Sequence, residues 1–115
     1  MPVPHMTARE AHPATARETL DRAMSEAEWQ KQVIEYAEMR GWACYHTHDS
    51  RRSQAGYPDL TLCRLSRILF VELKSAKGRV TREQAVWLNA LEGTGKCECH
   101  LWRPSDWPAI QEELL

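Results

Sequence analysis

The strongest limit on the fold of this chain is set by a short apolar run at residues 68–73, which contains one acidic residue, Glu72. A short, bounded apolar run of this kind is typical of a strand buried at the centre of a sheet. Lys74 follows directly, so two charged side chains stand at the end of a strand that should be buried. Because burying a charged group costs free energy, the pair needs a specific reason to be there.

The segments around this run carry helix and strand patterns in alternation. Ser25 and Glu28 form a capping box that begins a helix, and Gly41 is placed to end it. The other predicted elements are strands at 42–46, 59–63, 68–73 and 97–102, a helix opened by a capping box of Thr81 and Gln84, and a final helix capped by Ser105. The order α-β-β-β-α-β-α predicts an α/β fold with a central mixed sheet flanked by helices.

The length of 115 residues allows one domain with one modest core. We expect this domain at residues 25–115, after a tail at 1–24 in which residues 15–24 either form a short helix or are disordered. No apolar run approaches the roughly 18 residues needed to cross a membrane, and the tail has no apolar signal core, which predicts a cytoplasmic protein. The net charge of -1 means that any surface for DNA must come from local clusters of basic residues.

Asp59, Glu72 and Lys74 are the candidate catalytic residues. Glu72 and Lys74 leave the same face of their strand, and a hairpin turn at residues 64–67 would bring Asp59 to the same end of the sheet. Two carboxylates can hold Mg²⁺ or Mn²⁺, with the backbone carbonyl of Leu73 as a further ligand. Lys74 would orient or deprotonate the attacking water. The alternative for the Glu72–Lys74 pair is a solvated salt bridge across strands.

The motifs around these residues resemble those of the PD-(D/E)xK nuclease superfamily and, within it, the VRR-NUC family, over residues 25–112. The motifs that carry the resemblance are Gly56-Tyr57-Pro58-Asp59-Leu60, Phe70-Val71-Glu72-Leu73-Lys74, Gln84-x-x-Trp87-Leu88 and Trp102-Arg103-Pro104. The resemblance implies a restriction-endonuclease-like core and an endonuclease that hydrolyses phosphodiester bonds of DNA with a divalent metal. It also implies a bacterial or phage-encoded homodimer that acts on branched DNA such as Holliday junctions.

The first helix fits the superfamily pattern imperfectly. A third acid often faces the site from this helix, but Gln30 stands at that position here. Glu26 lies one turn earlier on the same face and is our candidate for an outer metal ligand, with Gln30 as an orienting hydrogen-bonder. Glu28 is better explained by the capping box. Gln84 has two readings, a cap partner by local rules and a site neighbour by the family pattern.

Two clusters of basic and polar residues flank the candidate site in the sequence. Phosphate contacts from such residues give affinity for DNA without reading its sequence. The alternative is ordinary solvated loop charge, and a minor role in proton transfer is open to His46 or His48. The residues that we expect to contact DNA are Arg51, Arg52, Ser53, Lys77, Arg79 and Arg82.

Zinc is a weaker alternative for the metal. Cys97-x-Cys99-His100 and His46-x-His48 hold zinc-ligand residue types, but structural zinc sites usually space their cysteines by two to four residues. Cys97, Cys99 and Leu101 are better read as an inward-facing row of a strand.

Two rival functions remain open at this stage: a non-catalytic nucleic-acid-binding module on a nuclease scaffold, and a small structural protein. Trp29, Trp42 and Trp87 fall on predicted core faces, so we expect them to pack rather than to stack on bases.

Overall fold

The computed structural model describes residues 13–47 and 54–115, and its centre is a four-stranded mixed sheet. The strands lie in the order β1 (Ala43–His46), β2 (Leu60–Arg64), β3 (Arg67–Leu73) and β4 (Glu98–Trp102). The first two pairings are antiparallel and the third, between β3 and β4, is parallel. This arrangement confirms the predicted mixed α/β fold with a central mixed sheet.

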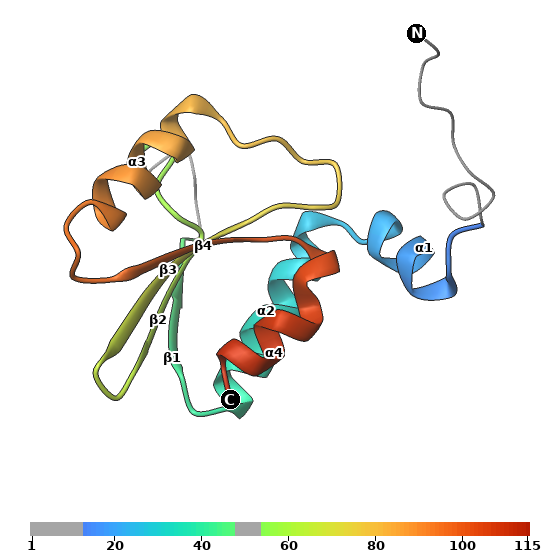
Figure 1. The fold of residues 1–115 in the computed structure, drawn as a ribbon, viewed down its shortest axis with the longest axis horizontal. Coiled ribbons are helices and arrows are strands. Elements are labelled where there is room, and N and C mark those ends of the chain that lie inside the picture. The colour runs from blue at the N-terminus through green and yellow to red at the C-terminus, as the bar shows by residue number, and fades with distance from the viewer. Residues whose placement is uncertain (1–12, 48–53) are drawn as a thin grey trace, which may run out of the picture.

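The described residues form four α-helices: α1 (Ala16–Ala23), α2 (Glu26–Met39), α3 (Arg82–Glu92) and α4 (Trp107–Glu113). Helices α2 and α4 lie side by side on one face, and α3 lies on the other (Figure 1). Helix α1 forms inside the segment expected as a tail and packs against the short 3₁₀ turn η1 (Pro104–Asp106). None of the helices within the described ranges is long and apolar enough to cross a membrane.

The main core lies between the sheet and the α2/α4 layer. The indole N–H of Trp29 donates to the Trp102 carbonyl at 3.0 Å, and that of Trp42 donates to the Leu114 carbonyl at 3.1 Å. Both indoles therefore combine apolar burial with a satisfied polar group, as predicted for these two core tryptophans. The buried side chains of this core are Trp29, Val33, Ala37, Trp42, Leu60, Leu62, Leu69, Val71, Leu73, Trp102, Ile110 and Leu114.

The opposite face of the sheet is only partly covered. Tyr57 stacks edge-to-face on Phe70 and on Trp87 of α3, and Trp87 is half-buried rather than a full core residue. The prediction that Leu101 belongs to an inward row is wrong, because its side chain is 38% exposed. Helix α3 has no fully buried residue, so this face of the edge strand β4 is not sealed from solvent.

Side-chain hydroxyls begin three of the helices, as the sequence patterns suggest. Thr15, Ser25 and Thr81 each accept a hydrogen bond from the backbone N–H three residues further on. At α3 the bond is reciprocated, since the Gln84 side chain accepts from the backbone N–H of Thr81 at 2.8 Å. This confirms the predicted capping box at the start of α3.

The prediction that Ser105 caps the last helix is wrong. Pro104 has no N–H to donate and begins the turn η1, and the Asp106 carboxylate accepts from the backbone N–H of Arg103 at 2.8 Å. Ser105 therefore lies inside the 3₁₀ turn, and α4 begins at Trp107. Asp106 is the N-cap residue of α4, and its side chain makes no capping hydrogen bond to that helix.

The hairpin of β2 and β3 fixes the positions of the candidate residues. Leu60 lies opposite Val71, which places Asp59 and Glu72 side by side at the next step of the ladder. The turn at the far end contains Leu65, which has a φ of 56° and is almost fully exposed. The strand ends next to Asp59 and Glu72 therefore lie at the opposite end of the hairpin from its turn.

Candidate active site

Asp59 is held in place at the start of β2. Its Oδ2 accepts a hydrogen bond from the backbone N–H of Leu73 at 2.8 Å, which ties the two strand ends together. The preceding loop leans on α3: Gly56 has a φ of +84°, and a Cβ there would lie 2.4 Å from the Glu83 carbonyl carbon. Only glycine permits this approach and this backbone conformation. The motif that carries Asp59 is thus seated against the start of α3.

Glu72 is the most unusual acid of the described chain. It is 1% exposed, and neither carboxylate oxygen has a hydrogen-bond partner among the described residues. Burial, the negative charge of Asp59 and the contact between the two carboxyl groups raise the pKa of Glu72 to about 9, while the charge of Lys74 acts in the opposite direction. A buried carboxyl without a donor is costly unless a cation is supplied.

Lys74 completes the group predicted from the sequence. Its residue is 8% exposed, and its backbone N–H continues the ladder by donating to the Trp102 carbonyl at 3.1 Å. The effect of its charge on the pKa of Glu72 shows that the ammonium lies near that carboxyl. The structure thus brings Asp59, Glu72 and Lys74 together at one end of the sheet.

The first long helix carries the two polar residues that were suggested for supporting roles, Glu26 and Gln30. Glu26 is exposed in the first turn of α2, and its negative charge contributes to the raised pKa of Glu72. Gln30 is half-buried one turn later and has no hydrogen-bond partner among the described residues. The charge of Glu26 thus acts on Glu72, whereas no contact among the described residues connects Gln30 with the site.

A pocket of about 330 Å³ opens beside Asp59. Gln84 is one of its lining residues, so it combines the cap role shown by its hydrogen bonds with a place next to the site. The pocket lies between the loop that carries Asp59 and the first turn of α3. Its lining residues are Thr47, Gln54, Ala55, Gly56, Tyr57, Asp59, Thr81, Glu83 and Gln84.

The basic residues that follow Lys74 are free to meet a ligand. Lys77, Arg79 and Arg82 are all exposed, and none forms an ion pair with another residue of ranges 13–47 and 54–115. His46 ends β1 opposite Leu60 and is half-buried. The other residues predicted to meet DNA or to move protons, Arg51, Arg52, Ser53 and His48, lie outside the described residues.

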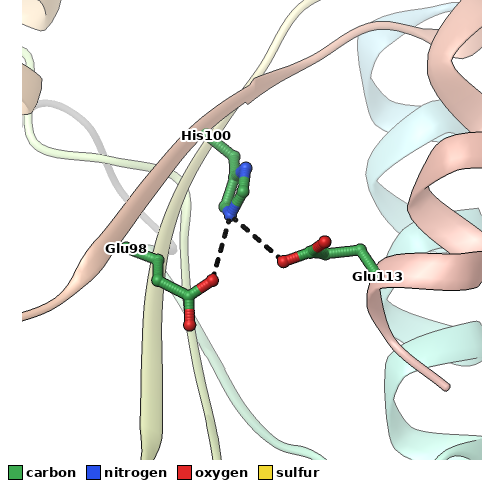
Figure 2. A group of neighbouring side chains, drawn as sticks. All are labelled: Glu98, His100 and Glu113. Carbon is green, nitrogen blue, oxygen red and sulfur yellow. Dashed lines mark ion pairs between the residues drawn. The ribbon is translucent and has the colours of Figure 1, made fainter.

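A second acidic group, which the sequence patterns did not reveal, lies near the opposite end of β3. Glu98, His100 and Glu113 place one ligand atom each within 4.8 Å of one another, and His100 Nε2 lies 3.7 Å from Glu98 and 3.9 Å from Glu113 (Figure 2). Arg67 already donates to both oxygens of Glu98 at 2.8 Å and to Glu113 at 2.6 Å. A guanidinium therefore fills the place that a cation would need.

The cysteines of β4 do not belong to that group. The Cys97 thiol donates to the Leu91 carbonyl at 3.3 Å, and burial together with Cys97 raises the pKa of Cys99 to about 11. Neither thiol belongs to a group of three or more potential metal ligands within the described residues. The geometry of these residues gives no support to the zinc alternative.

Comparison with known proteins decides the family. A sequence model of the VRR-NUC domain matches residues 9–100. The chain belongs to the VRR-NUC family. A solved structure of a VRR_NUC domain protein is 19% identical and superposes with a TM-score of 0.60 over 80% of this chain and 91% of that chain. No curated protein matches this chain.

Family membership confirms the predicted restriction-endonuclease-like fold and makes this a domain of the nuclease type with DNA as the substrate class. The matched residues 9–100 include α1 and extend into β4, so they contain Asp59, Glu72 and Lys74 together with the loop that follows them.

Proposed function

We propose that this VRR-NUC domain is a divalent-metal-dependent DNA endonuclease in which Asp59 and Glu72 hold the ion. The observation that carries the proposal is the Glu72 carboxyl, 1% exposed and without a hydrogen-bond donor, beside Asp59 and Lys74. In a nuclease-type domain, a buried acid of this kind is explained by a cation that neutralises it.

The donor set suits a hard cation, Mg²⁺ or Mn²⁺. Asp59 uses Oδ2 to accept from Leu73 N–H, which leaves Oδ1 for an ion, and Glu72 offers both of its oxygens. The Leu73 carbonyl and, through water, Glu26 are the further ligands in this proposal. When bound, the ion supplies Lewis acidity at the scissile phosphate and lowers the pKa of the attacking water.

The protein's own groups would then perform the remaining steps. Lys74 orients the attacking water or accepts its proton, and its charge offsets the negative charge that builds on the phosphate. The hydrogen bond from Leu73 N–H keeps the Asp59 carboxylate in one orientation at 2.8 Å. Gln30 and Gln84 would hydrogen-bond water molecules at the site. Because their amides are neutral, they would add no charge to it.

The substrate in this proposal is branched DNA such as a Holliday junction, cleaved by a homodimer. A domain of 115 residues has little surface for a four-way junction, and paired symmetric cuts require two sites. Exposed Lys77, Arg79 and Arg82, which carry no ion pair within the described chain, follow the site and support a phosphate-tracking role. Arg51, Arg52 and Ser53 are assigned the same role from the sequence alone.

The proposal is tested by Mn²⁺-dependent cleavage of end-labelled four-way junction, flap and linear duplex substrates. The wild type should cut the branched substrates in preference to the duplex, and Glu72→Gln should not cut. Glu92→Gln is the matched control, since Glu92 is exposed at the end of α3. Binding of DNA without any cleavage by the wild type would instead establish a non-catalytic binding module, and equal cleavage of all three substrates would refute the preference for branches.

A further inference from the structure

Arg103 lies at the same edge of the sheet as the proposed site. Strands β3 and β4 are parallel, so the residues that follow them, Lys74 and Arg103, leave the sheet side by side. The backbone N–H of Arg103 donates to the Asp106 carboxylate at 2.8 Å, which fixes the start of the turn η1. Arg103 is therefore presented from a defined backbone position rather than from a free loop.

The guanidinium of Arg103 holds the loop that follows β3. Its Nη1 donates to the Ser75 carbonyl at 2.8 Å and to the Gly78 carbonyl at 2.7 Å. The loop also closes on itself, since the Gly78 N–H donates to the Ser75 carbonyl at 3.2 Å. One charged donor thus connects both ends of a tight turn to the end of β4.

This turn lies against the Lys74 side chain. A Cβ at Gly78 would come within 3.3 Å of Lys74 Cδ and within 3.2 Å of Ser75 Oγ, so the backbone of the turn packs on the aliphatic part of Lys74. Lys74 is only 8% exposed. Its ammonium has no hydrogen-bond acceptor among the described residues, so hydrogen bonding does not explain this burial. The turn is what covers it on this side.

We propose that Arg103 is a positioning residue for Lys74. By holding the carbonyls of Ser75 and Gly78, it keeps the turn packed on the Lys74 side chain and so directs the ammonium at Glu72. This inference rests on the proposed role of Lys74 for its effect on cleavage, but the clamp itself is a property of the fold. A displacement of about 1 Å in a group that acts on the attacking water is enough to cost about 100-fold in rate.

Arg64 provides a matched control at the other end of the sheet. Its Nη1 donates to the Arg40 carbonyl at 2.8 Å and to the Leu114 carbonyl at 3.3 Å, and its Nη2 donates to the Leu115 carbonyl. Both arginines therefore bind backbone carbonyls, but only Arg103 binds the turn on Lys74. A variant of Arg64 therefore shows the effect of losing an arginine that binds backbone carbonyls elsewhere, and a variant of Arg103 shows the effect of releasing the turn on Lys74.

The first measurement is hydrogen exchange of the full chain, because it does not depend on cleavage. In Arg103→Met the amides of residues 75–80 should exchange about tenfold faster or more, with the core strands unchanged. Arg103→Lys should restore part of the protection, and Arg64→Met should leave these amides unchanged. Unchanged exchange in Arg103→Met, or equal acceleration in Arg64→Met, would overturn the clamp.

The second measurement is single-turnover cleavage at saturating DNA and Mn²⁺. Arg103→Met should lower the rate about 10- to 100-fold in the wild type but by less than about twofold in a Lys74→Met background. An equal loss in both backgrounds would show that Arg103 does not act through Lys74. If the wild type itself does not cleave, the proposed function fails, and the exchange of residues 75–80 still decides whether Arg103 holds the turn.

Discussion

The two ends of strand β3 both place acidic groups beside the sheet, but they treat them in opposite ways. At one end Glu72 is 1% exposed and finds no donor among the described residues. At the other, Arg67 binds Glu98 and Glu113 through three hydrogen bonds of 2.6 to 2.8 Å, and His100 lies beside both acids (Figure 2). The presence of acidic residues alone therefore does not distinguish the two ends of β3.

The difference between these ends separates a site from a structural network. The acids around Arg67 already accept hydrogen bonds from its guanidinium, and they connect the starts of β3 and β4 to α4. Glu72 has only Lys74 to balance it, while Asp59 and Glu26 add to the negative charge around it. A buried acid whose oxygens accept no hydrogen bond from the described residues is suited to receive a cation, and acids whose oxygens already accept from an arginine are not.

The largest contrast that we expect is in catalysis. Glu72→Gln should lower the cleavage rate by about 10³-fold, because it removes a negatively charged oxygen ligand of the metal ion that acts on the phosphate. Glu98→Gln should stay within about twofold of the wild type, because Glu98 lies at the other end of the sheet. The rates are to be compared under single-turnover conditions with Mn²⁺. A loss of similar size in both variants would remove the distinction between the two ends.

Metal binding should stabilise the protein through one end alone. At a Mn²⁺ concentration of 100 times its Kd, binding adds about 2.7 kcal/mol to the free energy of unfolding. For a domain of this size the midpoint of thermal unfolding would rise by roughly 10 °C or more. We expect the rise in wild type and in Glu113→Gln, and its absence in Glu72→Gln. A rise that disappears in Glu113→Gln would place the ion among Glu98, His100 and Glu113 instead.

The metal-free protein should show opposite pH responses at the two ends. The folded-state pKa of Glu72 is raised from 4.5 to about 9, so the folded protein keeps a proton that the unfolded chain releases, and stability falls as the pH rises between these values. The slope from one such group is at most about 1.4 kcal/mol per pH unit. Glu72→Gln should flatten it in urea unfolding measured without metal.

At the other end, hydrogen bonds from Arg67 lower the pKa of Glu98. Its contribution is present above the pKa of the unfolded carboxyl and is lost as the pH falls through the lowered value. Glu98→Gln should therefore weaken the acid-side loss of stability and leave the alkaline-side loss in place. If Glu98→Gln changed the slope between pH 4.5 and about 9, or Glu72→Gln changed the loss of stability below pH 4.5, the two ends would not be independent.

The candidate site was predictable because it rests on local rules. The period of two along a strand put Glu72 and Lys74 on one face, and a hairpin turn was enough to bring Asp59 beside them. These relations need no knowledge of distant packing. The fold class followed in the same way from caps and apolar runs: Thr81 and Gln84 form the predicted capping box, and Ser25 caps α2 without the predicted return bond from Glu28.

The features that the sequence did not reveal depend on long-range packing. Arg67 meets Glu98 and Glu113 only because β3 and β4 run parallel and α4 returns to the start of both strands. Leu101 is exposed because α3 leaves part of its face of the sheet uncovered. The same parallel pairing brings Arg103 beside Lys74. The order β3–α3–β4 would have predicted this neighbourhood if parallel pairing of the two strands had been assumed.

The smallest effect that we expect concerns the turn between β2 and β3, at the Arg67 end. Leu65 has a φ of 56°, a left-handed conformation that costs a leucine about 1 to 2 kcal/mol, and its side chain is 96% exposed, so little burial compensates. Strain of this kind often marks a functional site, but here it lies at the opposite end of the hairpin from Glu72. Leu65→Asn should therefore raise the free energy of urea unfolding by about 0.5 to 1 kcal/mol without changing cleavage. Leu65→Ala keeps the Cβ and should bring no such gain. If Leu65→Asn slowed cleavage, the strained turn would contribute to the activity. The Arg67 end of β3 would then not be purely structural.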